Sequence, residues 1–70
     1  MEYIIDSENQ YFNTLKEVRL HLFLMSENDK MQYNNTILYC IKKNEVIKTK
    51  LIRISKKGKI TFSRIKAKIY

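Results

Sequence analysis

This 70-residue sequence contains one cysteine and one histidine, Cys40 and His21, whose thiol and imidazole could act as a nucleophile and a base. A cysteine nucleophile needs a base and an orienting group beside it, and a zinc site needs about four nitrogen or sulfur ligands. The cysteine lies in the apolar run 37–41, where a thiol acts as a small hydrophobe, and His21 between two leucines suits a surface or boundary position. The sequence therefore predicts neither a nucleophilic site nor a metal site.

The acidic residues and the glycine content also argue against an enzyme. Glu2, Asp6 and Glu8 lie near the start of the chain, and we expect them to be solvated rather than held in the apolar surroundings that tune a catalytic acid or base. A phosphate-binding loop is rich in glycine, and this chain has one glycine. We expect no enzymatic activity, no cofactor and no small-molecule substrate.

Lysine and arginine are the residues whose number and position indicate a function. The formal net charge is +7; residues 1–35 hold three basic and six acidic residues, and residues 36–70 hold eleven basic residues and one acidic residue. A basic cluster attracts phosphate backbones because counterions are released when it binds. The sequence therefore favours a polyanion, either nucleic acid or an acidic protein surface, over a basic surface that serves solubility alone. The predicted contact residues are Lys48, Lys50, Arg53, Lys56, Lys57, Lys59, Arg64, Lys66 and Lys68.

These basic residues lie on a predicted β-hairpin. Its loop is Lys56-Lys57-Gly58, with the glycine in the left-handed conformation that a three-residue loop requires. Antiparallel pairing outward from this loop makes the numbers of facing residues sum to 114. One face of the hairpin then carries the pairs Ile54–Ile60, Ile52–Phe62, Lys50–Arg64 and Lys48–Lys66.

That face is apolar near the loop and basic further from it. We expect a bulge or a strong coil of the strands near residues 51–52 and 63–64 to reconcile the two parts. Like charges directly across two strands cost up to about 1 kcal/mol for each pair, and an anionic ligand on this face would turn the repulsion into attraction. The alternative is that the lysines splay apart in water and protect an edge strand from unwanted pairing.

The predicted contacts are mainly to a nucleic-acid backbone, with duplex favoured. We expect Phe62 to pack in the core, so the basic face offers few rings for base stacking, and the positions of Tyr39 and Tyr70 stay open. Among the predicted contact residues, only Arg53 and Arg64 have the planar fork that contacts a base edge with two hydrogen bonds. Sequence preference should therefore be limited.

The elements that position these residues are predicted to form a single α+β domain over residues 1–70. A short strand at 2–5 precedes a helix that starts at the capping box Thr14-x-x-Glu17 and runs to Met25. A four-three-four-three spacing of apolar residues marks the buried side of this helix. The stripe is Tyr11, Leu15, Val18, Leu22 and Met25.

The helical segment has a second apolar strip, Leu20, Phe23 and Leu24. Two apolar faces on one helix need two partners, so we predict this strip as a protein-interaction surface for another protein or for a second copy of the chain. Apolar residues also alternate with other residues over 18–25, which leaves a strand as the rival interpretation.

The rest of the chain is predicted as a polar loop at 26–35 followed by a three-stranded antiparallel meander. Its strands span 36–42, 46–55 and 59 to at least 63, and a helix is the alternative for the last eight residues. The predicted order is β-α-β-β-β, with the helix packed on one face of the sheet. The predicted core is Ile5, Leu15, Val18, Leu22, Ile37, Tyr39, Ile41, Ile47, Leu51 and Ile65.

Composition supports two further hypotheses about function. Asn, Ile, Lys and Tyr are abundant and Pro is absent, which is typical of a gene from an AT-rich microbial genome, a virus, or a phage or other mobile element. The chain would then be a small protein that inhibits or adapts a host protein, or a homo-oligomeric assembly subunit. The single cysteine, the acidic start of the chain and the lack of a 20-residue apolar run favour the cytoplasm and no membrane partner.

Overall fold

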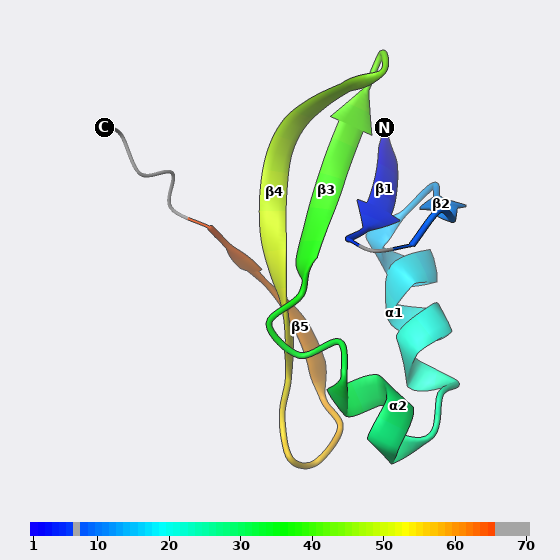
Figure 1. Cartoon of the computed structure of the whole chain (residues 1–70), viewed down its shortest axis with the longest axis vertical. Helices are drawn as coiled ribbons and strands as arrows, with labels where there is room; N and C mark the ends of the chain where they lie inside the picture. The colour runs from blue at the N-terminus through cyan, green and yellow to red at the C-terminus, as the bar shows by residue number, and fades with distance from the viewer. Residues whose placement is uncertain (7, 66–70) are drawn as a thin grey trace.

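The computed structural model describes residues 1–6 and 8–65, which form one five-stranded antiparallel sheet and two helices (Figure 1). The strand order across the sheet is β2-β1-β3-β4-β5. The predicted α+β class is confirmed, with one short strand and one short helix added to the predicted elements. The elements are β1 (Glu2–Ile5), β2 (Tyr11–Phe12), α1 (Leu15–Phe23), α2 (Glu27–Met31), β3 (Ile37–Lys42), β4 (Glu45–Ile54) and β5 (Ile60–Arg64).

Helix α1 begins at the predicted capping residue. The backbone N–H of Glu17 donates to Thr14 Oγ1 over 3.1 Å, and the Glu17 carboxylate accepts from the backbone N–H of Asn13 over 3.1 Å. Two backbone donors at the start of the helix are satisfied in this way. Leu24 caps the other end, so the helix is shorter than predicted, and the strand interpretation of this segment is wrong.

Two short elements were not predicted. Tyr11 and Phe12 pair with β1 as β2, so the helical stripe does not extend back to Tyr11. The segment 26–35 is not entirely loop, because Ser26 accepts a hydrogen bond from the backbone N–H of Asp29 over 3.3 Å and thereby caps α2. One turn of helix needs little more than such a cap, which is why hydrophobic spacing does not reveal it.

The hairpin between β3 and β4 contains the irregularity of the sheet. Lys43 and Asn44 have φ angles of 53° and 66°, as a two-residue type I′ turn requires. The register shifts between Cys40 and Ile41, which leaves Ile47 as the extra residue of a bulge. The pairing near residues 51–52 and 63–64 contains no bulge, so of the two features predicted there only the strong coil stays a prediction.

The hairpin between β4 and β5 has the predicted register. Lys50 faces Arg64, and the pairing continues without a break to Ile54 facing Ile60. Gly58 has a φ of 85°, which confirms its left-handed position in the loop. The predicted pairing of Lys48 with Lys66 lies outside the described residues.

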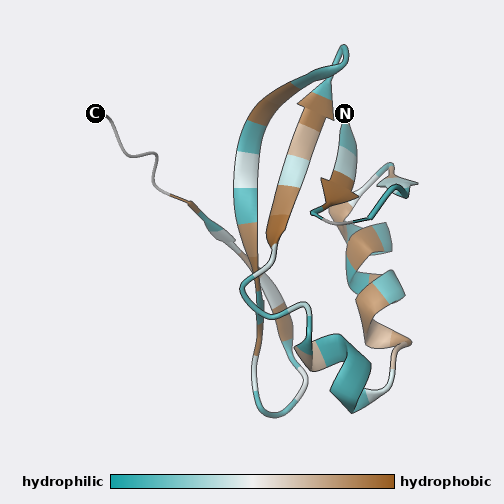
Figure 2. Ribbon diagram, in the orientation of Figure 1, coloured by the Kyte–Doolittle hydropathy of each residue, from teal (hydrophilic) through white to brown (hydrophobic). Residues whose placement is uncertain are grey.

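The core lies between α1 and one face of the sheet. Its strand residues are on one face because paired residues, and alternate residues along a strand, point to the same side. Figure 2 shows hydrophobic segments in β1, β3 and α1, whereas α2 and the turn between β3 and β4 are hydrophilic. The buried cluster is Ile5, Phe12, Val18, Leu22, Leu38, Ile52, Ile54 and Ile60.

The predicted core is right for β1 and α1 but wrong for the meander. Ile5, Val18 and Leu22 are fully buried, and Leu15 packs against the cluster from a half-buried position. On the meander the helix covers the other face, since Leu38 joins Ile52 and Ile54 there in an unbroken apolar patch. The wrongly placed residues are Ile37, Tyr39, Ile41, Leu51 and Ile65, which are half-buried, and Ile47, which is exposed.

Neither helix in the described residues is long and apolar enough to span a lipid bilayer.

Candidate nucleic-acid interface

Lys48, Lys50 and Arg64 lie on the face of the sheet that packs against α1. Leu38 of the core faces Lys50, and Lys50 faces Arg64, so these side chains form one row across β3, β4 and β5. Cys40 and Lys48 form the next row. We call Lys48, Lys50 and Arg64 the basic rim, because they continue the core face beyond its apolar part.

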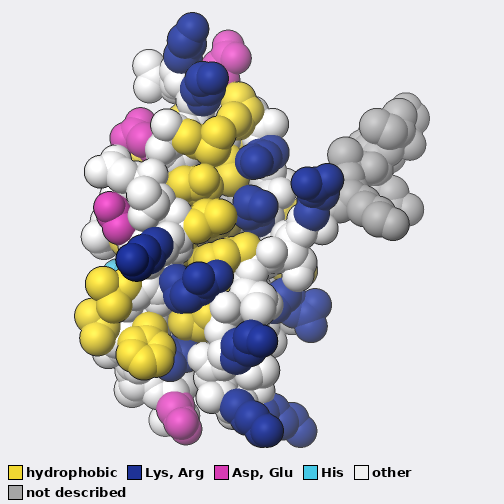
Figure 3. Space-filling view, turned by 180° about the vertical axis from the view of Figure 1, so that it is seen from behind, with side chains coloured by type: hydrophobic (Ala, Val, Ile, Leu, Met, Phe, Trp, Pro, Cys, Tyr) yellow, Lys and Arg dark blue, Asp and Glu magenta, His cyan; other side chains and the backbone are white. Residues whose placement is uncertain are grey.

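The basic rim belongs to a larger separation of charge over the surface. Figure 3 shows the side of the molecule that faces away from the viewer in Figure 1. A band of hydrophobic side chains runs down its middle, Lys and Arg gather along one side and at the lower end, and most Asp and Glu in view lie on the other side. The asymmetry of charge along the sequence thus becomes an asymmetry in space.

The pair of Lys50 and Arg64 brings two cations close together. The backbone N–H of Ser55 donates to the carbonyl of Lys59 over 3.0 Å, and pair types alternate along an antiparallel ladder, so Lys50 and Arg64 form a non-hydrogen-bonded pair. In such pairs the Cα atoms are about 4.5 Å apart and the side chains are closest. The like charges therefore repel each other across the two strands.

A groove accompanies these cations. Its volume is about 330 Å³, and its lining carries three basic side chains and no acidic one. The groove follows four consecutive residues of β4 and the end of β5, and its basic lining suits a phosphate backbone. The lining residues are Ile47, Lys48, Thr49, Lys50, Arg64 and Ile65.

The positive charge of the rim is not neutralised by the described carboxylates. Within residues 1–6 and 8–65, the one carboxylate close to a basic side chain is that of Glu8, beside the His21 imidazole, and no lysine or arginine pairs with a carboxylate. Cys40 lies beneath this charge: burial raises the pKa of its thiol, while the ammonium groups of Lys48 and Lys50 act in the opposite direction. The charge of the rim is thus available to an anion.

The folded chain adds a cation that the sequence did not indicate. The guanidinium carbon of Arg19 lies 5.4 Å from the centroid of the Phe62 ring, and Phe62 shares its face with Arg64 two residues along β5. Arg19 belongs to the acidic half of the sequence, so a charge count assigns it no role. Only the packing of α1 against β5 brings it toward the basic rim.

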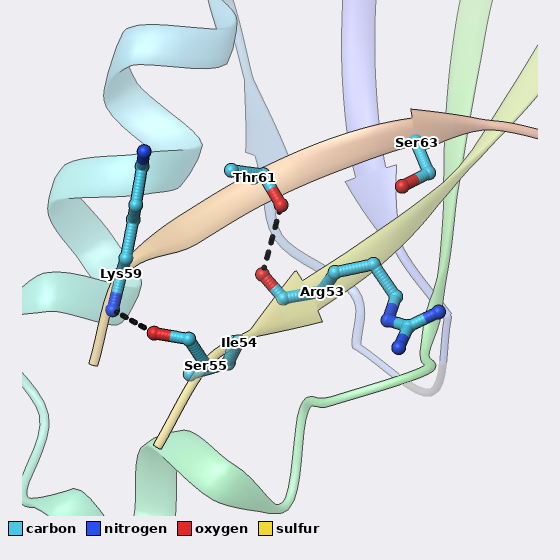
Figure 4. A pocket seen from close by; sticks show the side chains of 6 residues that line it. All are labelled: Arg53, Ile54, Ser55, Lys59, Thr61 and Ser63. Atoms are coloured by element: carbon cyan, nitrogen blue, oxygen red, sulfur yellow. Dashed lines mark hydrogen bonds between the residues drawn. The ribbon is translucent and has the colours of Figure 1, made fainter. Parts of the chain in front are cut away.

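Arg53, another predicted contact residue, lies on the opposite face of the sheet, where it faces Thr61. Figure 4 shows its side chain running along the sheet toward Ser63, while Lys59 points away from it. Thr61 Oγ1 donates to the carbonyl of Arg53 over 3.4 Å, beside a shallow pocket of about 360 Å³. The pocket is lined by Arg53, Ile54, Ser55, Lys59, Thr61 and Ser63.

The remaining predicted contact residues are not part of the basic rim. Lys56 and Lys57 are exposed in the loop between β4 and β5, and Lys59 is exposed directly after it. Lys66 and Lys68 lie outside the described residues. The structure therefore divides the predicted basic face into a rim on one side of the sheet, a loop at its end and Arg53 on the other side.

The aromatic side chains do not make the rim a base-stacking surface. Phe62 is half-buried against the core and Arg19 lies over its ring. Tyr39 and Tyr11 are on the opposite face, where the hydroxyl of Tyr39 donates to Asp6 Oδ1 over 3.5 Å. Tyr70 lies outside the described residues. Contacts to a phosphate backbone are therefore what this face offers best.

The histidine belongs to a small polar cluster away from the rim. His21 Nε2 lies 3.6 Å from Glu8 Oε1, and the Tyr33 hydroxyl donates to the same carboxylate. That hydrogen bond, with some burial, raises the pKa of Tyr33 to about 12. The His21 ring also contacts Phe12, with ring centroids 5.1 Å apart. The cluster ties the segment after β1 to both helical regions.

The described residues contain no group of three or more histidine, cysteine, aspartate or glutamate side chains placed to hold a metal ion. No protein-family model, curated protein or solved structure matches this chain, so its function is inferred from the geometry described above.

Proposed function

We propose that this chain is a small, non-enzymatic nucleic-acid-binding protein that contacts a phosphate backbone through its basic rim. The observation that carries the proposal is the pairing of Lys50 with Arg64 beside Lys48, with no described carboxylate to neutralise them. A bound phosphate backbone would offset the repulsion between these cations. Arg19, which lies over the neighbouring Phe62 ring, adds a fourth positive charge.

The number of cations sets the expected dependence on salt. Each neutralised phosphate of duplex DNA contributes about −0.9 to the slope of log K against log salt concentration. Four contacts, from Lys48, Lys50, Arg64 and Arg19, therefore give a slope of about −3 to −4. Lys48, Lys50 and Arg64 are spaced along the neighbouring β-strands β4 and β5. This spacing suits contacts to the phosphates of one strand of duplex DNA better than contacts to base edges.

The test is fluorescence anisotropy of the full chain with labelled duplex DNA, single-stranded DNA and RNA, from about 50 to 200 mM salt. We expect duplex binding with the slope given above. The double substitution Lys50→Glu and Arg64→Glu should weaken duplex binding by about 100-fold or more, because two attractive charges become repulsive ones. No binding at the lowest salt concentration would contradict the proposal.

A matched control separates the basic rim from net charge. Lys42→Glu with Lys43→Glu makes the same change in charge at the exposed turn between β3 and β4. This control should keep most of the affinity of the unmodified chain. An equal loss in both double variants would mean that net charge, and not the rim, attracts the nucleic acid.

A further inference from the structure

Helix α1 presents an exposed apolar strip toward solvent. The exposed fractions are 55% for Leu20, 63% for Phe23 and 74% for Leu24, although each is a large hydrophobic side chain. They follow the i, i+3, i+4 spacing of one helical face, opposite the face that buries Val18 and Leu22. Figure 3 shows hydrophobic side chains protruding at the lower left, over α1, with basic side chains beside them.

A groove between α1 and the start of β5 adjoins this strip. Its volume is about 410 Å³, its apolar lining includes Phe23 and Ile60, and its charged lining consists of Arg19 and Lys59. Lys30 adds a third cation, with its Nζ 5.2 Å from the centroid of the Phe23 ring. No acidic side chain lines the groove, so apolar surface and positive charge meet in one place.

The chemistry of the strip suits a protein better than a nucleic acid. Leu20, Phe23 and Leu24 offer no hydrogen bond to a phosphate or to a base edge. They also lie at the carboxyl end of α1, where the helix dipole is negative and disfavours phosphate. Burial of these apolar side chains against a protein partner would remove them from water, which favours association.

A second copy of the chain fits the strip poorly. Stable dimers bury about 800 Å² on each partner, from roughly 20 to 30 residues, and three helical side chains with one groove provide much less. A second copy would also bring its own Arg19, Lys30 and Lys59 toward the same cations, in a chain of net charge +7. Charge complementarity calls instead for a partner with acidic residues around apolar anchors.

We infer that the strip and groove form a docking site for an acidic amphipathic helix of another protein. Apolar anchors of that helix would pack on Leu20, Phe23 and Leu24, and its carboxylates would pair with Arg19 and Lys59. This surface lies on α1 and its groove; it shares Arg19 with the proposed nucleic-acid contacts but none of Lys48, Lys50 and Arg64. The inference does not depend on nucleic-acid binding.

The test uses three labelled 18-residue peptides and the full chain. The first has leucine at helical i, i+3, i+4 and i+7 spacing with glutamate elsewhere, the second replaces glutamate by lysine, and the third is a scramble of the first. We expect the acidic amphipathic peptide to bind at least about 10-fold more tightly than either of the others, because only it matches both the apolar strip and the charge.

Substitutions locate the binding. Leu20→Gln with Leu24→Gln removes apolar surface without changing charge or helix propensity much, and should weaken peptide binding about 10-fold or more while leaving duplex DNA binding unchanged. The matched control is Val46→Thr with Ile47→Thr, which alters two exposed apolar side chains of β4, at 55% and 46% exposure. It should bind the peptide as the unmodified chain does.

Three results would overturn the inference. The basic peptide could bind as tightly as the acidic one, or the Leu20 and Leu24 substitutions could leave binding intact. Alternatively, sedimentation equilibrium could show a dimer of the unmodified chain that the same substitutions dissociate, which would assign the strip to a second copy. The Lys50→Glu, Arg64→Glu variant separates the two proposals, because it should lose DNA and keep the peptide.

Discussion

The two ends of the hairpin between β4 and β5 share one register and present side chains on one face, yet only one end is buried. At one end, Ile52, Ile54 and Ile60 are buried against the helical side of the molecule. At the other end, Lys50 and Arg64 lie on the same face of the hairpin, beyond its buried part. The ladder between them is unbroken, so the difference comes from what packs on each end and not from a change in the strands.

Energetics explain why both ends can coexist. Complete burial of an isoleucine side chain contributes about 1.5–3 kcal/mol, and three of them lie at the covered end. The repulsion between Lys50 and Arg64 costs up to about 1 kcal/mol. Packing at the covered end can therefore hold the register that keeps the two cations together at the open end.

The largest expected effect comes from breaking the covered end. Ile52 is fully buried, so Ile52→Ala should lower the free energy of unfolding by about 2–5 kcal/mol, measured by urea denaturation. The neighbouring Leu51→Ala is the control, because Leu51 is half-buried on the opposite face. A loss from Leu51→Ala as large as that from Ile52→Ala would contradict the assignment of the covered face.

The next effect depends on pH. The folded pKa of Tyr33, about 12, lies above its ordinary value of 10.0, because the neutral hydroxyl donates to Glu8. The folded state therefore holds its proton longer, so this stabilisation is complete below pH 10 and is lost as pH rises toward 12. Tyr33→Phe should lower stability near neutral pH and make the decline above pH 10 shallower.

Tyrosinate absorbance during an alkaline titration provides the measurement for Tyr33. Loss of Tyr33 should remove the component that titrates last. Tyr11→Phe is the matched control, since Tyr11 is 56% exposed. If Tyr33→Phe instead removed a component that titrates near pH 10, the hydrogen bond to Glu8 would not hold the proton.

Weakening the start of α1 should lower the free energy of unfolding by a moderate amount, because α1 packs on the buried end of the hairpin. Thr14→Ala removes the acceptor for the backbone N–H of Glu17 and should cost about 0.5–2 kcal/mol in urea denaturation. Thr14→Ser keeps a hydroxyl at the same position and should cost far less. Equal losses from the two variants would mean that the threonine methyl group, and not its hydroxyl, matters here.

The smallest effect has the opposite sign and belongs to the open end. Lys50→Thr removes the like-charge pair with Arg64 and should raise the free energy of unfolding by a few tenths up to about 1 kcal/mol. The gain should shrink in high salt, which screens the repulsion. The control is Lys42→Thr, which should not raise the free energy of unfolding, because Lys42 faces Glu45. An equal rise in that variant would mean that the strand propensity of threonine, and not relief of repulsion, causes the gain.

Local signals explain which predictions from sequence succeeded. The capping box at Thr14 and Glu17 sets the start of α1, and the glycine at position 58 sets the loop from which the whole register of β4 and β5 follows. These signals depend on a few neighbouring residues. Helix α2 was missed because one capping serine before a polar turn leaves no hydrophobic period to detect.

The face covered by α1 was the main error. Both faces of the meander carry isoleucine and leucine, so alternation along each strand does not say which face the helix takes. The bulge of the sheet lies at Ile47, where composition gives no signal, and not near residues 51–52 and 63–64, where a bulge or a strong coil was predicted. Of the candidate site, the sequence predicted the pairing of Lys50 with Arg64 but missed Arg19, which reaches this region only across the packed helix.

The sequence by itself determined the register of the last hairpin, the start of α1 and the separation of charge, because each depends on residues close together in the chain. Tertiary structure decided which face of the sheet is buried, where Arg19 lies and that Leu20, Phe23 and Leu24 stay exposed. Those features depend on contacts between α1 and strands far away in the sequence. Which faces of the helix and the sheet are buried depends on how well whole surfaces pack together, and no residue pattern within one segment encodes that.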